Sequence, residues 1–103
     1  MTWKTPPKRN LVRAVLALEN ADQAQRFLRD LLTPNEIEEF ATRLQTADML
    51  SRNVPYTTIV KTTGFSSTTV ARVAKWLKSG MNGYQLVLAK LHHPVAQRRS
   101  GLV

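Results

Sequence analysis

The sequence predicts an all-α protein whose 103 residues form a single domain of about six helices. Apolar residues recur at spacings of three and four along most of the chain, which is the period of an amphipathic helix. Alternation typical of strands is weak, and the hairpin-like dipeptide Asn82-Gly83 has no alternating run on either side. Hydrophobic residues make up 43% of the chain, which is too many for a wholly disordered protein.

The first two predicted helices lie ahead of residue 33, behind a loose arm over residues 1–8. The first covers about residues 8–18. The second follows Asn20, which fits an N-cap with Gln23 at the reciprocal position of a capping box. Each helix places its apolar side chains on one stripe, with Leu11, Val12, Val15, Leu16 and Leu18 in the first and Ala24, Phe27, Leu28 and Leu31 in the second.

The third predicted helix has the clearest start signal in the chain. Thr33 is the expected N-cap, and Pro34 occupies the first helical position, where its missing N–H is no loss. Glu36 can reach back to the cap, and the helix should end near residues 52–53, before the next proline. Its expected buried stripe comprises Ile37, Phe40, Ala41, Leu44, Ala47 and Leu50.

Three further helices are predicted after Pro55. A short one over residues 56–63 is followed by Gly64, a residue able to adopt positive φ. The next has Ser66 or Ser67 as its cap and stops at Gly80. The last covers about residues 82–91, and a loose basic tail is expected over residues 92–103. The apolar side of the last helix carries Tyr84, Val87, Leu88 and Leu91.

Basic residues are distributed very unevenly along the chain, whose net charge is +8. All seven acidic residues fall between residues 19 and 48, whereas residues 49–103 contain eight lysines and arginines and no acid. A folded segment without carboxylates suits a polyanionic partner, and we expect that partner to be double-stranded DNA. A membrane surface is a poorer candidate, since the basic part lacks a strongly amphipathic helix. A solvated basic face without a partner is the alternative.

Other classes of function find little support in the residues. The chain has no cysteine, and the adjacent His92 and His93 lack an evident third metal ligand. A helix start explains the carboxylates of Glu36, Glu38 and Glu39, and no nucleophile–base set or glycine-rich phosphate loop is present. No apolar run approaches the roughly 20 residues of a membrane span. We therefore expect an unexported, cytoplasmic protein that is not an enzyme and holds no metal or cofactor.

Residues 55–79 are predicted to form a helix-turn-helix, in which the second helix enters the major groove of DNA. Gly64 supplies the turn. One residue departs from the usual motif, because Val60 stands at a crowded inward position where alanine or glycine is common. The apolar contacts between the two helices are expected from Ile59, Phe65, Val70 and Val73.

The second helix of this motif divides into three faces at about 100° per residue. The core face carries Val70, Val73, Ala74 and Leu77. A second face is small and basic, as close approach to a duplex requires, and it carries Ser67, Thr68, Ala71, Lys75 and Lys78. The third face carries Thr69, Arg72 and Trp76.

DNA contacts are assigned from these faces. Base contacts are expected from Ser66, Ser67, Thr68, Thr69, Ala71 and Lys75, where Ala71 can touch a thymine methyl group. Contacts to the phosphate backbone are expected from Lys61, Arg72 and Lys78.

Several motifs between residues 31 and 91 occur together in one known family. They are the helix start at residues 32–36, Arg43 ten residues after its cap, Gly64 followed by Thr-Val-Ala-Arg at residues 69–72, and the Gly-Met-Asn-Gly-Tyr turn at residues 80–84. Together they resemble the tryptophan-repressor superfamily, and most closely its short YerC/YecD-type members. The resemblance implies six helices per chain in an interlocked homodimer, whose two heads would enter adjacent major grooves about 34 Å apart.

The resemblance also implies a ligand pocket. The family positions that hold L-tryptophan fall on Thr33, Arg43, Thr69, Arg72, Val73 and Trp76. Two of them depart from the family repressor, which has glycine in place of Val73 and serine in place of Trp76. These larger side chains would occupy much of the ligand's space, and overfilling a packed site costs about 1–3 kcal/mol. The sequence therefore argues against binding of L-tryptophan.

Two interpretations of this pocket remain open. In the first, the indole of Trp76 replaces the ligand and leaves the DNA-binding head permanently set, while Arg72 is free to contact a DNA phosphate. In the second, Trp76 packs against the preceding long helix, and Arg43 and Arg72 pair with acids of that helix.

The sequence thus predicts a homodimeric, sequence-specific regulator of transcription, and a repressor by analogy with the resembling family. A chromosome-associated protein without sequence preference is one alternative, because a face rich in serine and threonine offers few bidentate base contacts. A helical protein–protein adaptor is another, and its affinity would be insensitive to salt, unlike binding to several phosphates.

Overall fold

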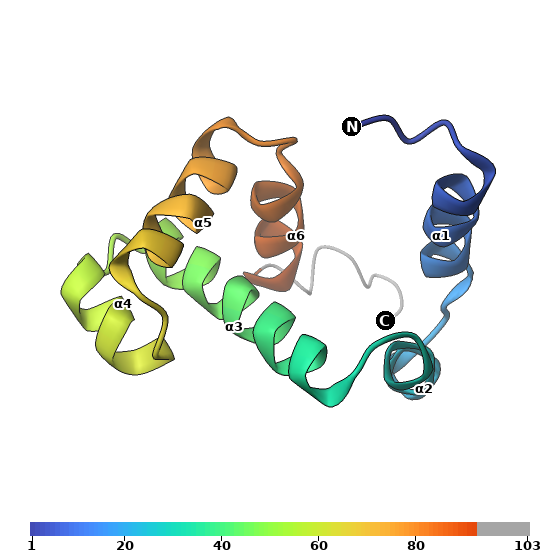
Figure 1. The fold of residues 1–103 in the computed structure, drawn as a ribbon, viewed down its shortest axis with the longest axis horizontal. Helices are drawn as coiled ribbons and strands as arrows, with labels where there is room; N and C mark the ends of the chain where they lie inside the picture. Colours follow the sequence, from blue (N-terminus) through green and yellow to red (C-terminus); the bar gives the residue numbers. More distant parts are fainter. Residues whose placement is uncertain (93–103) are drawn as a thin grey trace. The chain divides into compact units, whose positions relative to one another are not determined.

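The computed structural model describes residues 1–92, which form six helices and no strand (Figure 1). This confirms the all-α prediction. α6 includes His92, which had been assigned to the loose tail, and the rest of that predicted tail lies outside the described residues. The helices are α1 (Pro6–Ala17), α2 (Ala21–Leu31), α3 (Pro34–Ser51), α4 (Tyr56–Thr63), α5 (Ser67–Ser79) and α6 (Gly83–His92).

The chain divides into two compact units, Met1–Glu38 and Glu39–Val103, and the second is described through residue 92. In the first unit, α1 begins at Pro6, inside the arm that the sequence analysis expected to be loose. Two prolines fill its first turn, where they sacrifice no helical hydrogen bond.

α2 begins at the predicted cap. The backbone N–H of Gln23 donates to Oδ1 of Asn20 over 2.9 Å. The Gln23 side chain accepts from the N–H of Glu19 over 3.0 Å, one residue before the cap rather than at the cap itself. Two free N–H groups near the start of the helix are therefore satisfied by side chains.

Neither α1 nor α2 buries a single residue in this chain. Their apolar stripes form as predicted, but the side chains remain in contact with solvent, and Leu16 is 78% exposed. Val15 of α1 and Leu28 and Leu31 of α2 are exposed in the same way. Isolated helices of this length are marginal in water, so this unit needs a surface to cover its apolar stripes.

α3 begins with the predicted capping box. The N–H of Glu36 donates to Oγ1 of Thr33 over 3.1 Å, and the N–H of Thr33 donates to Oε1 of Glu36 over 2.9 Å. The helix ends at Ser51, and Asn53 follows with a φ of 62°. Near this end Asp48 forms an ion pair with Arg52, at 3.2 Å, and a hydrogen bond with Nε2 of His92, at 2.6 Å, which ties the end of α6 to α3.

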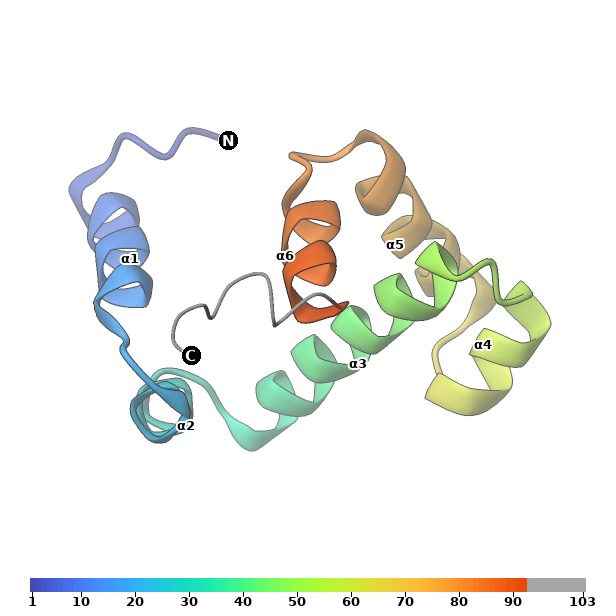
Figure 2. The ribbon, with the colours of Figure 1, turned by 180° about the vertical axis from the view of Figure 1, so that it is seen from behind.

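The core of the second unit is small and lies where three helices meet. Ala47 of α3, Val73 of α5 and Leu88 of α6 form one buried cluster. Figure 2 shows α5 and α6 beside α3, with α4 next to α5. Residues partly buried against the cluster are Leu50, Leu77 and Tyr84.

The predicted buried stripe of α3 is only partly buried. Ala47 is fully buried and Leu50 is partly covered, whereas Phe40 is 43% exposed and Ala41 and Leu44 also face solvent. Helical periodicity correctly identifies which residues share a face, but a single chain supplies too few side chains to cover all of it.

The turn from α5 to α6 requires glycine at position 80. The N–H of Gly80 donates to the carbonyl oxygen of Trp76 over 3.0 Å, and a Cβ at residue 80 would lie 2.4 Å from that same oxygen. The side chain of Gln85 donates to the carbonyl oxygen of Leu77 over 2.7 Å, which fastens the start of α6 to the last turn of α5. The elbow therefore has little freedom to adjust to a larger residue.

We expect Gly80→Ala to lower the free energy of unfolding by about 1–3 kcal/mol, since the methyl group must displace the backbone of Trp76. Gly83→Ala is the matched control, because a Cβ there meets nothing within 4 Å, and it should be neutral or stabilising by about 0.5–1 kcal/mol. Urea unfolding of both variants checks the prediction, and equal stabilities would contradict it.

Candidate nucleic-acid interface

α4 and α5 form the predicted helix-turn-helix around Gly64. This glycine has a φ of 78°, in the left-handed region, and its N–H donates to the carbonyl oxygen of Val60 over 3.0 Å. Ile59 and Val70 are fully buried, one on each helix of the motif. Val60, which departs from the usual motif, is partly buried, and the motif forms with it in place.

The corner between the two helices is held by Thr63. Its hydroxyl donates to the carbonyl oxygen of Ile59 over 2.7 Å and accepts from the N–H of Phe65 over 3.2 Å. Phe65 is half-buried at this corner. The corner therefore leads directly into the start of α5, where most of the predicted base-contacting residues lie.

Ser66 is the cap of α5. Its Oγ accepts from the N–H of Thr69 over 3.2 Å and lies 3.0 Å from the Thr69 hydroxyl. These two predicted DNA-contacting residues are thus hydrogen-bonded to each other in this structure. Ser67 and Thr68, which stand between them in the sequence, are exposed.

The small and basic face of α5 is fully exposed. Its members are Ser67, Thr68, Ala71, Lys75 and Lys78, and two further predicted DNA contacts, Lys61 on α4 and Arg72 on α5, are exposed as well. The acids in residues 39–92 are Glu39 and Asp48, and both are paired, with Arg43 and with Arg52 and His92. Within residues 39–92 no carboxylate therefore pairs with the lysines of this face or with Arg72.

Four of the six pocket positions converge on one cavity of about 330 Å³. Val73 is not among them, because it is fully buried in the cluster with Ala47 and Leu88. Thr33 is engaged as the cap of α3. The residues that line the cavity are Glu39, Arg43, Phe65, Thr69, Arg72 and Trp76.

Arg43 makes three contacts in this region. It forms an ion pair with Glu39 over 2.5 Å, and its guanidinium carbon lies 5.4 Å from the ring centroid of Phe40 and 5.5 Å from that of Trp76. Neither Glu39 nor Phe40 was predicted to belong to this site. Their spacings of four and three from Arg43 were the available signal, since side chains at these spacings meet on a helix.

These contacts bear on both interpretations of the pocket. Arg43 pairs with an acid of α3, as the second interpretation expects, and it also lies over the indole of Trp76. Arg72 lines the same cavity but has no ion-pair partner within residues 1–92.

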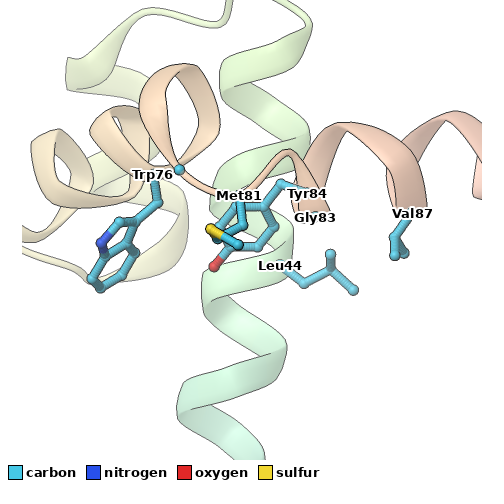
Figure 3. A pocket seen from close by; sticks show the side chains of 7 residues that line it. Leu44, Trp76, Met81, Gly83, Tyr84 and Val87 are labelled. Atoms are coloured by element: carbon cyan, nitrogen blue, oxygen red, sulfur yellow. The ribbon is translucent and has the colours of Figure 1, made fainter. Parts of the chain in front are cut away.

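A second cavity, of about 510 Å³, is also lined by Trp76 and is almost entirely apolar (Figure 3). Burial raises the pKa of the Tyr84 hydroxyl at this site, and the positive charge of Arg43 partly opposes that increase. This cavity was not predicted, although four of its lining residues belong to the Gly-Met-Asn-Gly-Tyr turn at residues 80–84. Its lining residues are Leu44, Trp76, Gly80, Met81, Gly83, Tyr84 and Val87.

The described residues contain no group of three or more histidine, aspartate or glutamate side chains that could hold a metal ion. None of the helices in residues 1–92 is both long and apolar enough to cross a membrane.

The fold and the exposed basic face define an all-helical protein of the helix-turn-helix class. A family profile described as Trp repressor protein matches residues 8–92. The chain belongs to this family, which is one of DNA-binding regulators.

Proteins of known sequence and structure agree with this assignment. The chain is 36% identical to YerC of Bacillus subtilis, an uncharacterized protein, over 81 residues that make up 79% of this chain and 78% of YerC. A TrpR-like protein from Eubacterium eligens superposes with a TM-score of 0.82 at 36% identity, covering 87% of this chain and 93% of the other. A candidate Trp repressor from Staphylococcus aureus gives a TM-score of 0.81 at 33% identity, covering 89% and 95%.

The cap of α5 generates a test within this interface. Ser66→Ala should lower the free energy of unfolding by about 1 kcal/mol, because the N–H of Thr69 loses its acceptor. Ser67→Ala removes a neighbouring exposed hydroxyl that does not cap the helix, and it should leave stability unchanged. Thermal unfolding of the two variants decides the matter, and a larger loss for the Ser67 variant would refute the assignment of the cap.

Proposed function

We propose that this protein is a homodimeric, sequence-specific regulator of transcription that binds double-stranded DNA through α5, acting in the cytoplasm as a repressor. The observation that carries the proposal is the exposed face of α5, where lysines and small side chains stand together without a neutralising carboxylate. Such a face can approach a duplex closely, and its charge attracts phosphates.

The proposed contacts divide between bases and backbone. Ser67, Thr68, Ala71 and Lys75 are exposed along one side of α5 and are our choice for the major groove, with Ser66 and Thr69 at its start. Lys61, Arg72 and Lys78 are our choice for the phosphates. Arg72 suits this role because it is exposed and forms no ion pair within residues 1–92, while Glu39, which lines the same cavity, pairs with Arg43.

The homodimer is proposed because the apolar faces of single chains need cover. α1 and α2 bury no residue, and in the second unit Leu44 of α3 and Leu86 and Leu91 of α6 are exposed. Large exposed apolar patches commonly mark protein–protein interfaces. Fully burying one such leucine contributes about 1.5–3 kcal/mol, so a second copy that interlocks with these helices would supply the missing core and unite both units in one domain.

A second candidate, within DNA binding, is a chromosome-associated protein without sequence preference. The observation that favours it is that the exposed small residues of α5 offer no bidentate base contact and leave Lys75 as the one long side chain among the proposed base-contacting residues. A protein–protein adaptor is the third candidate.

Salt dependence and substitution separate these candidates. Arg72→Ala should weaken binding to all DNA sequences and reduce the salt slope by about 1, because one phosphate contact is lost. Lys75→Ala should reduce selectivity between sequences if it contacts a base. Arg26→Ala on α2 is the control, since it also removes an exposed arginine, one that pairs with Asp22 and lies far along the chain from α5. Affinities measured over a salt series, with an operator fragment and with random DNA, check these expectations.

The operator fragment comes from sequencing the genomic DNA that the purified protein retains at physiological salt. A few enriched fragments with a two-fold symmetric site support the specific regulator. Uniform recovery supports the chromosome-associated protein, and recovery of no DNA contradicts both.

The dimer is tested by placing a charge on the uncovered stripe of α2. Leu28→Glu should dissociate the dimer, because the carboxylate would be buried at the interface without a partner. Gln25→Glu introduces the same charge outside that stripe and should leave the dimer intact. Sedimentation equilibrium measures both. A monomeric wild-type protein, or a dimeric Leu28→Glu variant, would contradict the proposed interface.

A further inference from the structure

Trp76 lines two cavities of different character. One is the apolar cavity of about 510 Å³ (Figure 3), and the other is the cavity of about 330 Å³ that Arg43 and Arg72 also line. Trp76 lines both and is 39% exposed. It lies outside the buried cluster of the second unit, so core packing alone does not account for a large aromatic residue at this position.

Arg43 connects this indole to α3. Glu39, one turn earlier on α3, holds the guanidinium by an ion pair, and Phe40 lies under it on the same helix. The remaining aromatic contact is with Trp76 of α5. A cation over an aromatic face is attracted by the ring's quadrupole, and the attraction strengthens as water is excluded. Arg43 is thus oriented by its own helix, and its guanidinium lies over the indole of Trp76 on α5.

The buried cluster and the contact of Arg43 with Trp76 constrain different motions of α5 on α3. Ala47 of α3 and Val73 of α5 belong to the cluster, and Leu50 and Leu77 pack against it, which limits how closely the helices approach. Apolar packing of this kind is not directional. The contact between Arg43 and Trp76 is directional and lies about one turn further along α5. It therefore resists rotation and tilting of α5 on α3.

We propose that Arg43 and Trp76 are positioning residues that clamp α5 at a fixed orientation on α3, so that its DNA-binding face is set without a bound small molecule. The proposal rests on the proposed function, because the orientation of α5 matters only if α5 contacts DNA. It assigns Trp76 a role that a small aromatic compound could fill if the side chain were removed.

The test compares DNA affinity of Trp76 variants in the full chain. Trp76→Phe keeps an aromatic face for Arg43 and should bind operator DNA nearly as well as the wild type. Trp76→Leu keeps apolar bulk without that face, and Trp76→Ala removes both, so each should bind about fivefold more weakly, the factor that corresponds to the loss of roughly 1 kcal/mol. Arg43→Met should show the same loss, and combining it with Trp76→Leu should add little.

Free indole provides a measurement that a purely structural role would not move. Millimolar indole should restore the DNA affinity of Trp76→Ala, because it fits the space that the missing side chain leaves. Indole should have no effect on the DNA affinity of Arg43→Met. Neither indole nor L-tryptophan should alter the affinity of the wild type. Thermal unfolding and sedimentation establish that each variant is folded and has the same oligomeric state as the wild type.

The outcomes are distinguishable. A wild-type protein that binds no DNA overturns the proposed function and the clamp together. A wild type that binds DNA, beside a folded Trp76→Ala variant with equal affinity, overturns the clamp alone. Loss of affinity that indole does not restore, or tightening of the wild type by L-tryptophan, also overturns it. Restoration by indole, confined to the Trp76→Ala variant, supports it.

Discussion

Ala47 and Val73 meet in the interior of the second unit, and the approach of α5 to α3 depends on this contact. Both are fully buried, and Leu88 of α6 closes the same cluster. Since α4 packs on α5 through Ile59 and Val70, the placement of the helix-turn-helix on α3 follows from the same few apolar side chains. A core of this size fixes the distances between the helices, but the orientation of each helix depends on polar and aromatic contacts at the edge of the core. The elbow at Gly80 and the hydrogen bond from Gln85 to Leu77 orient α6. The proposed clamp would orient α5 in the same way.

The distribution of apolar side chains connects stability with assembly. In a single chain the first unit has no interior of its own, and half of the apolar face of α3 is uncovered. In the proposed dimer these faces become core, so folding and association would be one process and stability would depend on protein concentration. The basic face of α5 has the opposite character, because it remains polar and exposed. The surfaces proposed for a second copy and for DNA therefore lie on separate side chains.

Much of this architecture follows from local signals. The caps at Asn20 and Thr33 and the positive φ of Gly64 depend on residues within a few positions of one another, which is why the sequence locates the helices closely. The same holds for the core face of α5. What the sequence does not show depends on distant segments coming together. Periodicity marks Phe40 and Leu44 as apolar without showing what covers them, and the burial of Val73 away from the cavity depends on α6. The contact of Arg43 with Trp76 requires the packing of α3 on α5, and the assigned DNA contacts remain predictions.

The place of Trp76 in the lining of two cavities also has an evolutionary consequence. A single substitution to a small residue there would enlarge both an apolar hollow and one lined by two arginines, while the buried cluster around Val73 kept its own side chains. A lineage could thereby exchange an always-active regulator for one that answers to an aromatic metabolite, and could return by the reverse change. In this fold, the choice between constitutive and inducible control of genes would then depend on the residue at position 76 of α5.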